Sequence, residues 1–202
     1  MGLLATIISH AVGVPLGLLS ALRGGWVDTV ISRANDALLS IPHVMMGLVI
    51  IAALGSSIPI LVVSTGLMYA SAVYRISRAL ALDQRVKDYV EVAQVRGEGI
   101  AWILFREILP NMRGPLLTDF AIRMAFIVLF MSSISFLGLG VQPPNADWGS
   151  MVRENMEGLA RGSLAPIIPA AALASVTISL SLIMDEIAIR APIASRFGGL
   201  AS

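Results

Sequence analysis

The amino-acid sequence predicts an all-α membrane protein, a polytopic bundle of about five transmembrane helices. Hydrophobic residues make up 56% of the 202 residues, and the mean hydropathy is +0.83. Charged residues make up only 13% of the chain, whereas a soluble domain carries about 25%. The apolar residues also gather in long runs. A helix of about 20 such residues satisfies its own backbone hydrogen bonds while it crosses the hydrocarbon core.

Five apolar runs are the predicted spans of a single transmembrane domain, residues 1–202. Their expected ranges are 2–22, 37–54, 58–74, 115–139 and 164–184. Pro15 and Pro42 are expected inside helices, because neighbouring helices can satisfy the backbone groups that proline frees. Gly13 and Gly17 lie four residues apart, a spacing that permits close helix packing. The first run is predicted to be a retained span, because it lacks the basic start and the cleavage site of a signal peptide.

The basic residues predict the orientation of the chain. Half of them, 7 of 14, lie in the loop 75–114. They are Arg75, Arg78, Arg85, Lys87, Arg96, Arg106 and Arg113. By the positive-inside rule, this loop and the C-terminus are cytoplasmic, and the N-terminus and the loop 140–163 lie outside. The odd number of spans leads us to expect a further helix before this sequence.

Several classes of protein and of site are excluded by composition. The chain has no cysteine, so it has neither disulfides nor thiolate chemistry. His10 and His43 stand alone in apolar sequence, with no metal-ligand spacing around them. Lys87 is the only lysine and is not preceded by glycine, so the chain lacks a phosphate-binding loop. A net charge of +1 gives no indication of nucleic-acid binding. If a nucleotide drives this protein, another chain binds it.

The loop 75–114 is predicted to contain two short helices. Tyr89 and Val92 recur at helical spacing within residues 88–96. Gly97 and Gly99 then favour a turn, and a second helix is expected over 100–107, ended by Leu109-Pro110-Asn111. One interpretation is an amphipathic connector that lies on the membrane surface. The small residues flanking Glu91 favour docking into a cleft of a soluble partner instead.

The motifs of this loop resemble a known family. Glu91-x-Ala93-x-x-x-Gly97, followed by Ile108-Leu109-Pro110, is similar to the EAA motif of ABC-importer permeases, with Val92 where the family usually has alanine. Three further segments resemble the dipeptide/oligopeptide/nickel branch of that family, the DppC/OppC-like subunits. They are Gly24-Gly25-Trp26-Val27-Asp28, Ser40-Ile41-Pro42, and Ser135 to Pro144 followed by Asp147-Trp148-Gly149. The resemblance covers about Gly13 to Met184. Family members usually carry another helix before Gly2, and the tail at 184–187 departs from the family pattern.

The resemblance implies a MetI-like permease fold and a role in ATP-driven import of di- or oligopeptides across the inner membrane. The chain itself would perform no chemistry and bind no cofactor. Its partners would be a homologous permease subunit, two cytoplasmic ATPase subunits that bind ATP, and an extracytoplasmic solute-binding protein. The residues that would couple to an ATPase subunit are Glu91, Ala93, Gln94, Gly97, Leu109 and Pro110. The alternatives are an importer for nickel or another small solute, and a truncated permease without transport activity.

Polar residues within the fourth span are further candidates. Asp119 and Arg123 lie four residues apart on one helix face. They either neutralise each other near the cytoplasmic end or line the solute pathway. Ser132, Ser133 and Ser135 are candidates for pathway lining or interhelical hydrogen bonds. A proton-coupled secondary transporter is the rival class, but it predicts several midplane carboxylates and inverted repeats, which this sequence does not show.

The loop 140–163 is predicted to be ordered. Residues 142–149 are rich in turn-forming proline, asparagine and aspartate, and Trp148 is typical of a membrane–water interface. Residues 151–159 are expected to form a short interfacial helix. Together they would cap the outer mouth of the bundle.

Overall fold

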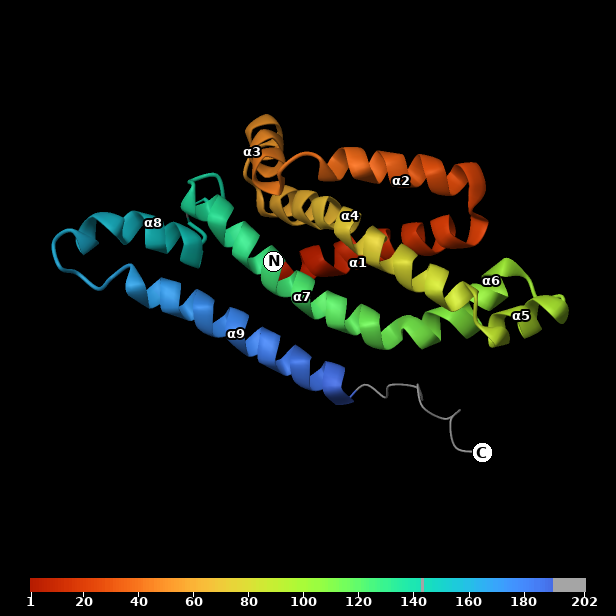
Figure 1. Cartoon of the computed structure of the whole chain (residues 1–202). Coiled ribbons are helices and arrows are strands. Elements are labelled where there is room, and N and C mark those ends of the chain that lie inside the picture. The colour runs from red at the N-terminus through yellow and green to blue at the C-terminus, as the bar shows by residue number, and fades with distance from the viewer. Residues whose placement is uncertain (143, 191–202) are drawn as a thin grey trace.

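The chain folds as an all-helical bundle in a computed structural model that describes residues 1–142 and 144–190 (Figure 1). Its helices in chain order are α1 (Gly2–Arg23), α2 (Gly25–Leu39), α3 (His43–Leu54), α4 (Ile58–Arg85), α5 (Asp88–Val95), α6 (Ile100–Trp102), a π-helical segment (Ile103–Ile108), α7 (Leu109–Phe136), α8 (Trp148–Leu159) and α9 (Ile167–Arg190). The described residues contain no strand. The predicted all-α class is confirmed.

Four long helices, α1, α4, α7 and α9, run along the length of the molecule (Figure 1). α1 packs against both α4 and α7, and α9 packs against α7. The short helices α5 and α6 lie at one end of the bundle, near the connection between α1 and α2, whereas α8 lies at the opposite end (Figure 1). The chain therefore places the predicted loop helices and the predicted outer helix at opposite ends of one bundle.

The contact between α1 and α4 is close because glycine faces the neighbouring backbone. A Cβ atom built on Gly13 would lie 2.7 Å from the carbonyl oxygen of Ala70, and one on Gly17 would lie 2.8 Å from that of Tyr74. Real Cβ atoms essentially never come within 3.0 Å of such atoms. The expectation that Gly13 and Gly17 permit close helix packing is confirmed.

The prediction of one helix over 37–54 is wrong. Residues 40–42 break the helix, and α2 and α3 meet at an angle of 84°. Pro42 has no N–H to donate and disfavours the helical conformation in the residue before it. It accordingly precedes α3 as the N-cap residue instead of lying inside a helix. The apolar sequence is therefore divided between a helix that lies along α4 and a shorter one that crosses it (Figure 1).

Two helices extend further than predicted. α4 continues to Arg85 instead of ending at residue 74, so its basic residues are helical. The predicted stop at Leu109-Pro110 is also wrong, because the helical run from Ile100 to Phe136 is continuous. Pro110 lies in the first turn of α7, immediately after the π-helical segment. A missing N–H costs least at that position, where a new α-helical hydrogen-bonding register begins.

Three helices in the described part of the chain are long and apolar enough to cross a membrane, and the bent pair α2–α3 is a possible fourth. The three are Gly2–Arg23, Ile58–Arg85 and Ile100–Phe136. The predicted fifth span, 164–184, overlaps α9. The apolar part of α9, Ile167–Ile183, is shorter than the three helices named above. The expected helix at 151–159 is confirmed as α8, which begins earlier, at Trp148, where Asp147 accepts hydrogen bonds from two backbone N–H groups. Pro143, one of the motif residues, lies outside the described residues.

Candidate functional site

The helix α5 has one buried and one exposed face. Val90 and Ala93 are fully buried and pack against the ends of α1, α4 and α7. The other members of this cluster are Leu18, Ala21, Ala81, Ile103, Ile108 and Met112. The opposite face, which consists of Glu91, Val92, Gln94 and Val95, is exposed, and Val95 is 83% exposed. We call these four residues the outer face of α5.

Ala93 therefore faces the bundle and not the surface that carries Glu91. Its relative exposure is 0%, and Ala81 of α4 and Ala21 of α1 are buried in the same cluster. Alanine at these three positions allows the helices to approach closely, because a larger side chain would have to displace its neighbours. The small residue of the motif thus packs α5 against the bundle, whereas its acidic residue lies on the exposed face.

Gly97 ends α5 in the conformation that glycine favours. Its φ is +80°, and its N–H donates to the carbonyl oxygen of Gln94 at 2.9 Å. The N–H of Glu98 donates to the carbonyl oxygen of Ala93 at 3.1 Å. This pair of bonds with a left-handed glycine is the Schellman motif. The predicted glycine turn is confirmed at Gly97, whereas Gly99 has an ordinary φ of −71°.

Side chains across the turn connect α5 to the segment that follows. The guanidinium of Arg96 lies 5.6 Å from the centre of the Trp102 ring, and its Nη2 lies 3.7 Å from Oε1 of Glu107. On the other side, Tyr89 donates a hydrogen bond from its hydroxyl to Gln84 of α4. Burial and the nearby Glu107 carboxylate raise the pKa of Tyr89, so its hydroxyl keeps its proton. Side-chain contacts therefore connect the start of α5 to α4 and the end of α5 to the next helical run.

The six predicted coupling residues fall into two groups. Glu91, Gln94 and Gly97 are exposed beside one another on α5 and its turn. Ala93 is buried, and Leu109 is partly buried against the same apolar cluster. Pro110 is exposed on the first turn of α7. The motif thus combines residues that form a surface with residues that attach this surface to the bundle.

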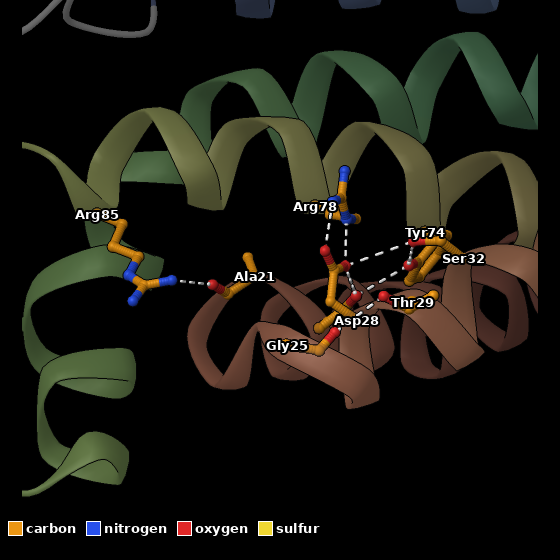
Figure 2. Close-up of polar contacts among 9 residues, drawn as sticks. Ala21, Gly25, Asp28, Thr29, Ser32, Tyr74, Arg78 and Arg85 are labelled. Carbon is orange, nitrogen blue, oxygen red and sulfur yellow. Dashed lines mark hydrogen bonds and ion pairs between the residues drawn. The ribbon is translucent and has the colours of Figure 1, made fainter.

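A polar network beside this end of the bundle joins α1, α2 and α4. Figure 2 shows Asp28 of α2 and Arg78 of α4 directed toward each other. Arg78 donates from Nε to Oδ1 of Asp28 at 2.5 Å and from Nη2 to Oδ2 at 2.6 Å. Ser20 of α1 also donates to this carboxylate. The hydroxyl of Tyr74 lies 2.9 Å from Oγ of Ser20 and 2.8 Å from Oγ of Ser32.

Sequence reasoning missed this network. Arg78 and Arg85 were both assigned to a basic loop, but Arg78 pairs with Asp28 and Arg85 donates to the carbonyl oxygen of Ala21 at 3.0 Å (Figure 2). One feature of the sequence could have indicated the network: Asp28 is the first acidic residue of the chain and follows a long apolar run. A lone carboxylate in such apolar sequence needs a partner, because an unpaired charge is costly to bury.

Asp119 and Arg123, which the sequence places on one helix face, form an ion pair in the structure. Nε of Arg123 donates to Oδ1 of Asp119 at 3.1 Å, and Asp119 is only 4% exposed. His10 of α1 completes the cluster, with Nε2 3.4 Å from Oδ2 of Asp119. Sequence reasoning did not connect His10 with this pair, because nothing local to residue 10 indicates which helix lies beside it.

The three candidate serines of α7 lie toward its α8 end and differ in environment. Ser133 is exposed and donates to the carbonyl oxygen of Leu129 in its own helix at 2.8 Å. Ser135 is buried against Gly140, where a Cβ would overlap the serine side chain. The carbonyl oxygen of Ser132 packs against Gly149 at the start of α8. Ser132 and Ser135 thus lie where Gly140 and Gly149 pack on α7, and Ser133 is the exposed member.

A cavity of about 570 Å³ lies between α3 and α4. Its lining is mostly aliphatic, with His43, Ser64 and Ser71 as polar members. The ring of His43 lies 5.1 Å from that of Tyr69. Among the described residues, no group of three or more His, Cys, Asp or Glu side chains could hold a metal ion.

These features define a polytopic helical membrane protein with a short surface helix attached to one end of its bundle. A chain of the MetNI methionine ABC transporter, solved in inward-facing conformations, has the same fold, with a TM-score of 0.76 over 92% of this chain and 88% of that chain at 14% identity. Residues 13–188 match the family described as binding-protein-dependent transport system inner membrane component. The chain belongs to this family, which confirms the predicted family and the MetI-like fold.

Curated relatives have names from the predicted branch. The chain is 30% identical to the glutathione transport system permease protein GsiD of Pectobacterium atrosepticum, 29% identical to the dipeptide transport system permease protein DppC of Haemophilus influenzae, and 32% identical to a putative peptide transport system permease protein of Brucella suis. The matches cover 91% or 92% of this chain and 61% or 62% of each relative. The chain thus spans about three fifths of the length of these relatives. Because the family consists of membrane transport components, the expectation that the chain is not an enzyme is confirmed.

Proposed function

We propose that this chain is a membrane subunit of an ATP-driven importer that carries short peptides across the inner membrane. The family and the names of the relatives support this proposal, since the relatives are named for the transport of dipeptides, peptides and glutathione, which is itself a tripeptide. In this proposal, ATP is bound by separate ATPase subunits and the chain holds no cofactor.

The observation that carries the proposal is the division of α5 into two faces. Val90 and Ala93 attach α5 to the bundle, and the outer face presents Glu91 and Gln94 beside two exposed valines. An ATPase subunit can change the conformation of the bundle only through contacts that differ between two states. A helix that is exposed on one side and packed against α1, α4 and α7 on the other is suited to pass a movement of the ATPase subunit to the bundle.

The proposed assembly contains a homologous permease subunit, two cytoplasmic ATPase subunits and an extracytoplasmic solute-binding protein. The α5 end of the bundle and the C-terminus are cytoplasmic, and the N-terminus lies outside. The exposed cations near α5 support this orientation, because such residues concentrate on the cytoplasmic side of membrane proteins. They are Lys87, Arg96, Arg106 and Arg113.

Co-purification with the ATPase subunits tests the proposal. Glu91→Lys reverses the charge on the outer face, and Val95→Asp puts a charge on an 83% exposed apolar position. Both variants should reach the membrane normally and retain ATPase about tenfold less well, because unmatched charges oppose docking. The matched control is Glu154→Lys, an exposed charge reversal on α8 at the opposite end. Full ATPase retention by both α5 variants, or equal loss in the control, would contradict the proposal.

A further inference from the structure

Three exposed arginines belong to three different helices. They are Arg33 of α2, Arg75 of α4 and Arg113 of α7. In the part of the chain that the structure describes, none of them forms an ion pair. Arg78, which follows Arg75 in the same helix, differs because it pairs with Asp28. The three arginines therefore carry positive charge that the chain itself does not neutralise.

Contacts between helices place Arg33 and Arg75 at the same level of the bundle. The hydroxyl oxygens of Ser32 and Tyr74 lie 2.8 Å apart, and these two residues immediately precede the two arginines. Tyr74 also marks a level on α1, because a Cβ atom on Gly17 would lie 2.8 Å from its carbonyl oxygen. Gly17 is therefore the reference glycine for comparing this level with α7.

Arg113 lies at this level as well. α1 and α7 run antiparallel, because Gly2 packs on Val128 and His10 lies beside Asp119. Each turn forward along α1 therefore corresponds to one turn back along α7. Continuing this register by about two turns beyond His10 brings the reference glycine opposite the turn that contains Arg113. The three arginines thus lie within about one helical turn of the same level, and we call them the arginine belt.

The arginine belt is one hydrocarbon thickness away from an exposed tryptophan near the other end of α7. Trp148 begins α8 and is 40% exposed, and the next residue, Gly149, packs on the carbonyl oxygen of Ser132 in α7. At 1.5 Å per residue, about 29 Å of α7 separates Arg113 from Ser132. The hydrocarbon core of a bilayer is about 30 Å thick, and tryptophan concentrates at its two boundaries. The belt therefore lies at the opposite boundary, at the level of the lipid headgroups.

We propose that the arginine belt binds the phosphate groups of anionic phospholipids in one leaflet of the membrane. A guanidinium is cationic, and its planar N–H groups match the oxygens of a phosphate. Few acidic side chains compete at this level. α4 has none before Asp83, and Asp119, the one acidic residue of α7, is buried.

α2 contributes the acidic residues nearest to the arginine belt. Asp28 is paired with Arg78. Asp36 is exposed about one turn from Arg33 and acts electrostatically on Arg78. Together with the three belt arginines, Asp36 leaves an excess of positive charge at this level. Lipids with a net negative charge complement this excess better than zwitterionic lipids do. The inference concerns the chain itself and does not depend on its assembly with an ATPase.

Native mass spectrometry of the full chain tests the proposal. The protein is released from nanodiscs that contain equal amounts of phosphatidylglycerol and phosphatidylcholine with the same acyl chains, and the retained lipids are counted. We expect the natural sequence to retain mainly phosphatidylglycerol. The triple variant Arg33→Gln, Arg75→Gln and Arg113→Gln should fold normally, because none of these residues is paired. Its ratio of retained phosphatidylglycerol to phosphatidylcholine should fall at least about fivefold.

The matched control removes the same charge from exposed positions further toward the α5 end. It combines Lys87→Gln, Arg96→Gln and Arg106→Gln and should keep the natural ratio of lipids. An unchanged ratio in the belt variant, or an equal fall in both variants, would overturn the proposal. If the belt variant keeps the natural ratio but no longer co-purifies with a homologous permease subunit, the arginines contact protein and the proposal is wrong.

Discussion

Arg78 of α4 and Asp28 of α2, 50 positions apart in the chain, are joined by two parallel hydrogen bonds of 2.5 and 2.6 Å. Paired N–H groups of a guanidinium match the two oxygens of a carboxylate, so this contact fixes both distance and orientation. Ser20 of α1 reaches the same carboxylate. These hydrogen bonds therefore join α1, α2 and α4 near the end of the bundle where α5 packs.

We expect Arg78→Lys to lower the stability of the bundle. Lysine keeps the charge but offers a point donor in place of the planar pair, so about 1–2 kcal/mol of unfolding free energy should be lost. Thermal unfolding of the purified protein measures this. Arg75→Lys is the control, because Arg75 is exposed on the same helix. Equal effects of the two substitutions would show that the paired geometry is unimportant.

Gly97→Ala should strain the turn that follows α5. Gly97 has a φ of +80° with open space around it, so the cost is conformational, about 1 kcal/mol for a side chain in the left-handed region. Gly99→Ala is a close control, because Gly99 also has open space but an ordinary φ. The rate of tryptic cleavage after Arg96 should rise in the first variant only. A similar rise in both variants would show that the added methyl group, and not the positive φ of Gly97, causes the faster cleavage.

Ala93→Leu should loosen α5 from the bundle, since overpacking of a full core typically costs about 1–3 kcal/mol. The absence of cysteine in the natural sequence makes this measurable. With Val90→Cys as the single, buried thiol, Ala93→Leu should increase the rate of maleimide labelling. Val92→Leu enlarges a side chain on the exposed outer face instead and should leave the labelling slow. Fast labelling of the Val90→Cys variant alone would mean that α5 is not packed against the bundle.

Gly17→Val should destabilise the contact between α1 and α4, because its Cβ would lie 2.8 Å from the Tyr74 carbonyl oxygen. We expect a reduced amount of protein in the membrane and a lower unfolding temperature. Ala11→Val is the control, since Ala11 is exposed on the same helix. Normal levels and stability of Gly17→Val would show that the two helices can separate without cost.

The sequence predicted the helical class and the glycine turn because both depend on local chemistry. Long apolar runs must become helices in lipid, and Gly97 can adopt a φ that other residues rarely take. Two of the prolines were predicted less well. Pro42 interrupts a helix and Pro110 begins one, whereas Pro15 lies inside α1 as expected. Neighbouring helices decide which outcome occurs, and one chain segment does not contain that information.

The candidate site was predicted in part for the same reason. The motif identified the segment around Glu91 and Gly97, but only packing shows that Ala93 faces inward. Partners distant in the chain were also missed. Asp28 and Arg78 meet through the course of α2 along α4, and His10 and Asp119 meet because α1 packs on α7. Neither pairing has a signature in the spacing of residues.

The continuous helical run Ile100–Phe136 has a mechanical consequence. Its 37 residues form a rod about 55 Å long, with Asp119 near its midpoint. If the rod tilts about that midpoint by about 10°, each end moves about 5 Å, in opposite directions. A displacement beside the Gly97 turn would then produce an opposite displacement at the end of the bundle where α8 lies (Figure 1). The cluster of His10, Asp119 and Arg123 would lie beside the midpoint of this tilt, where movement is smallest and close polar contacts can persist.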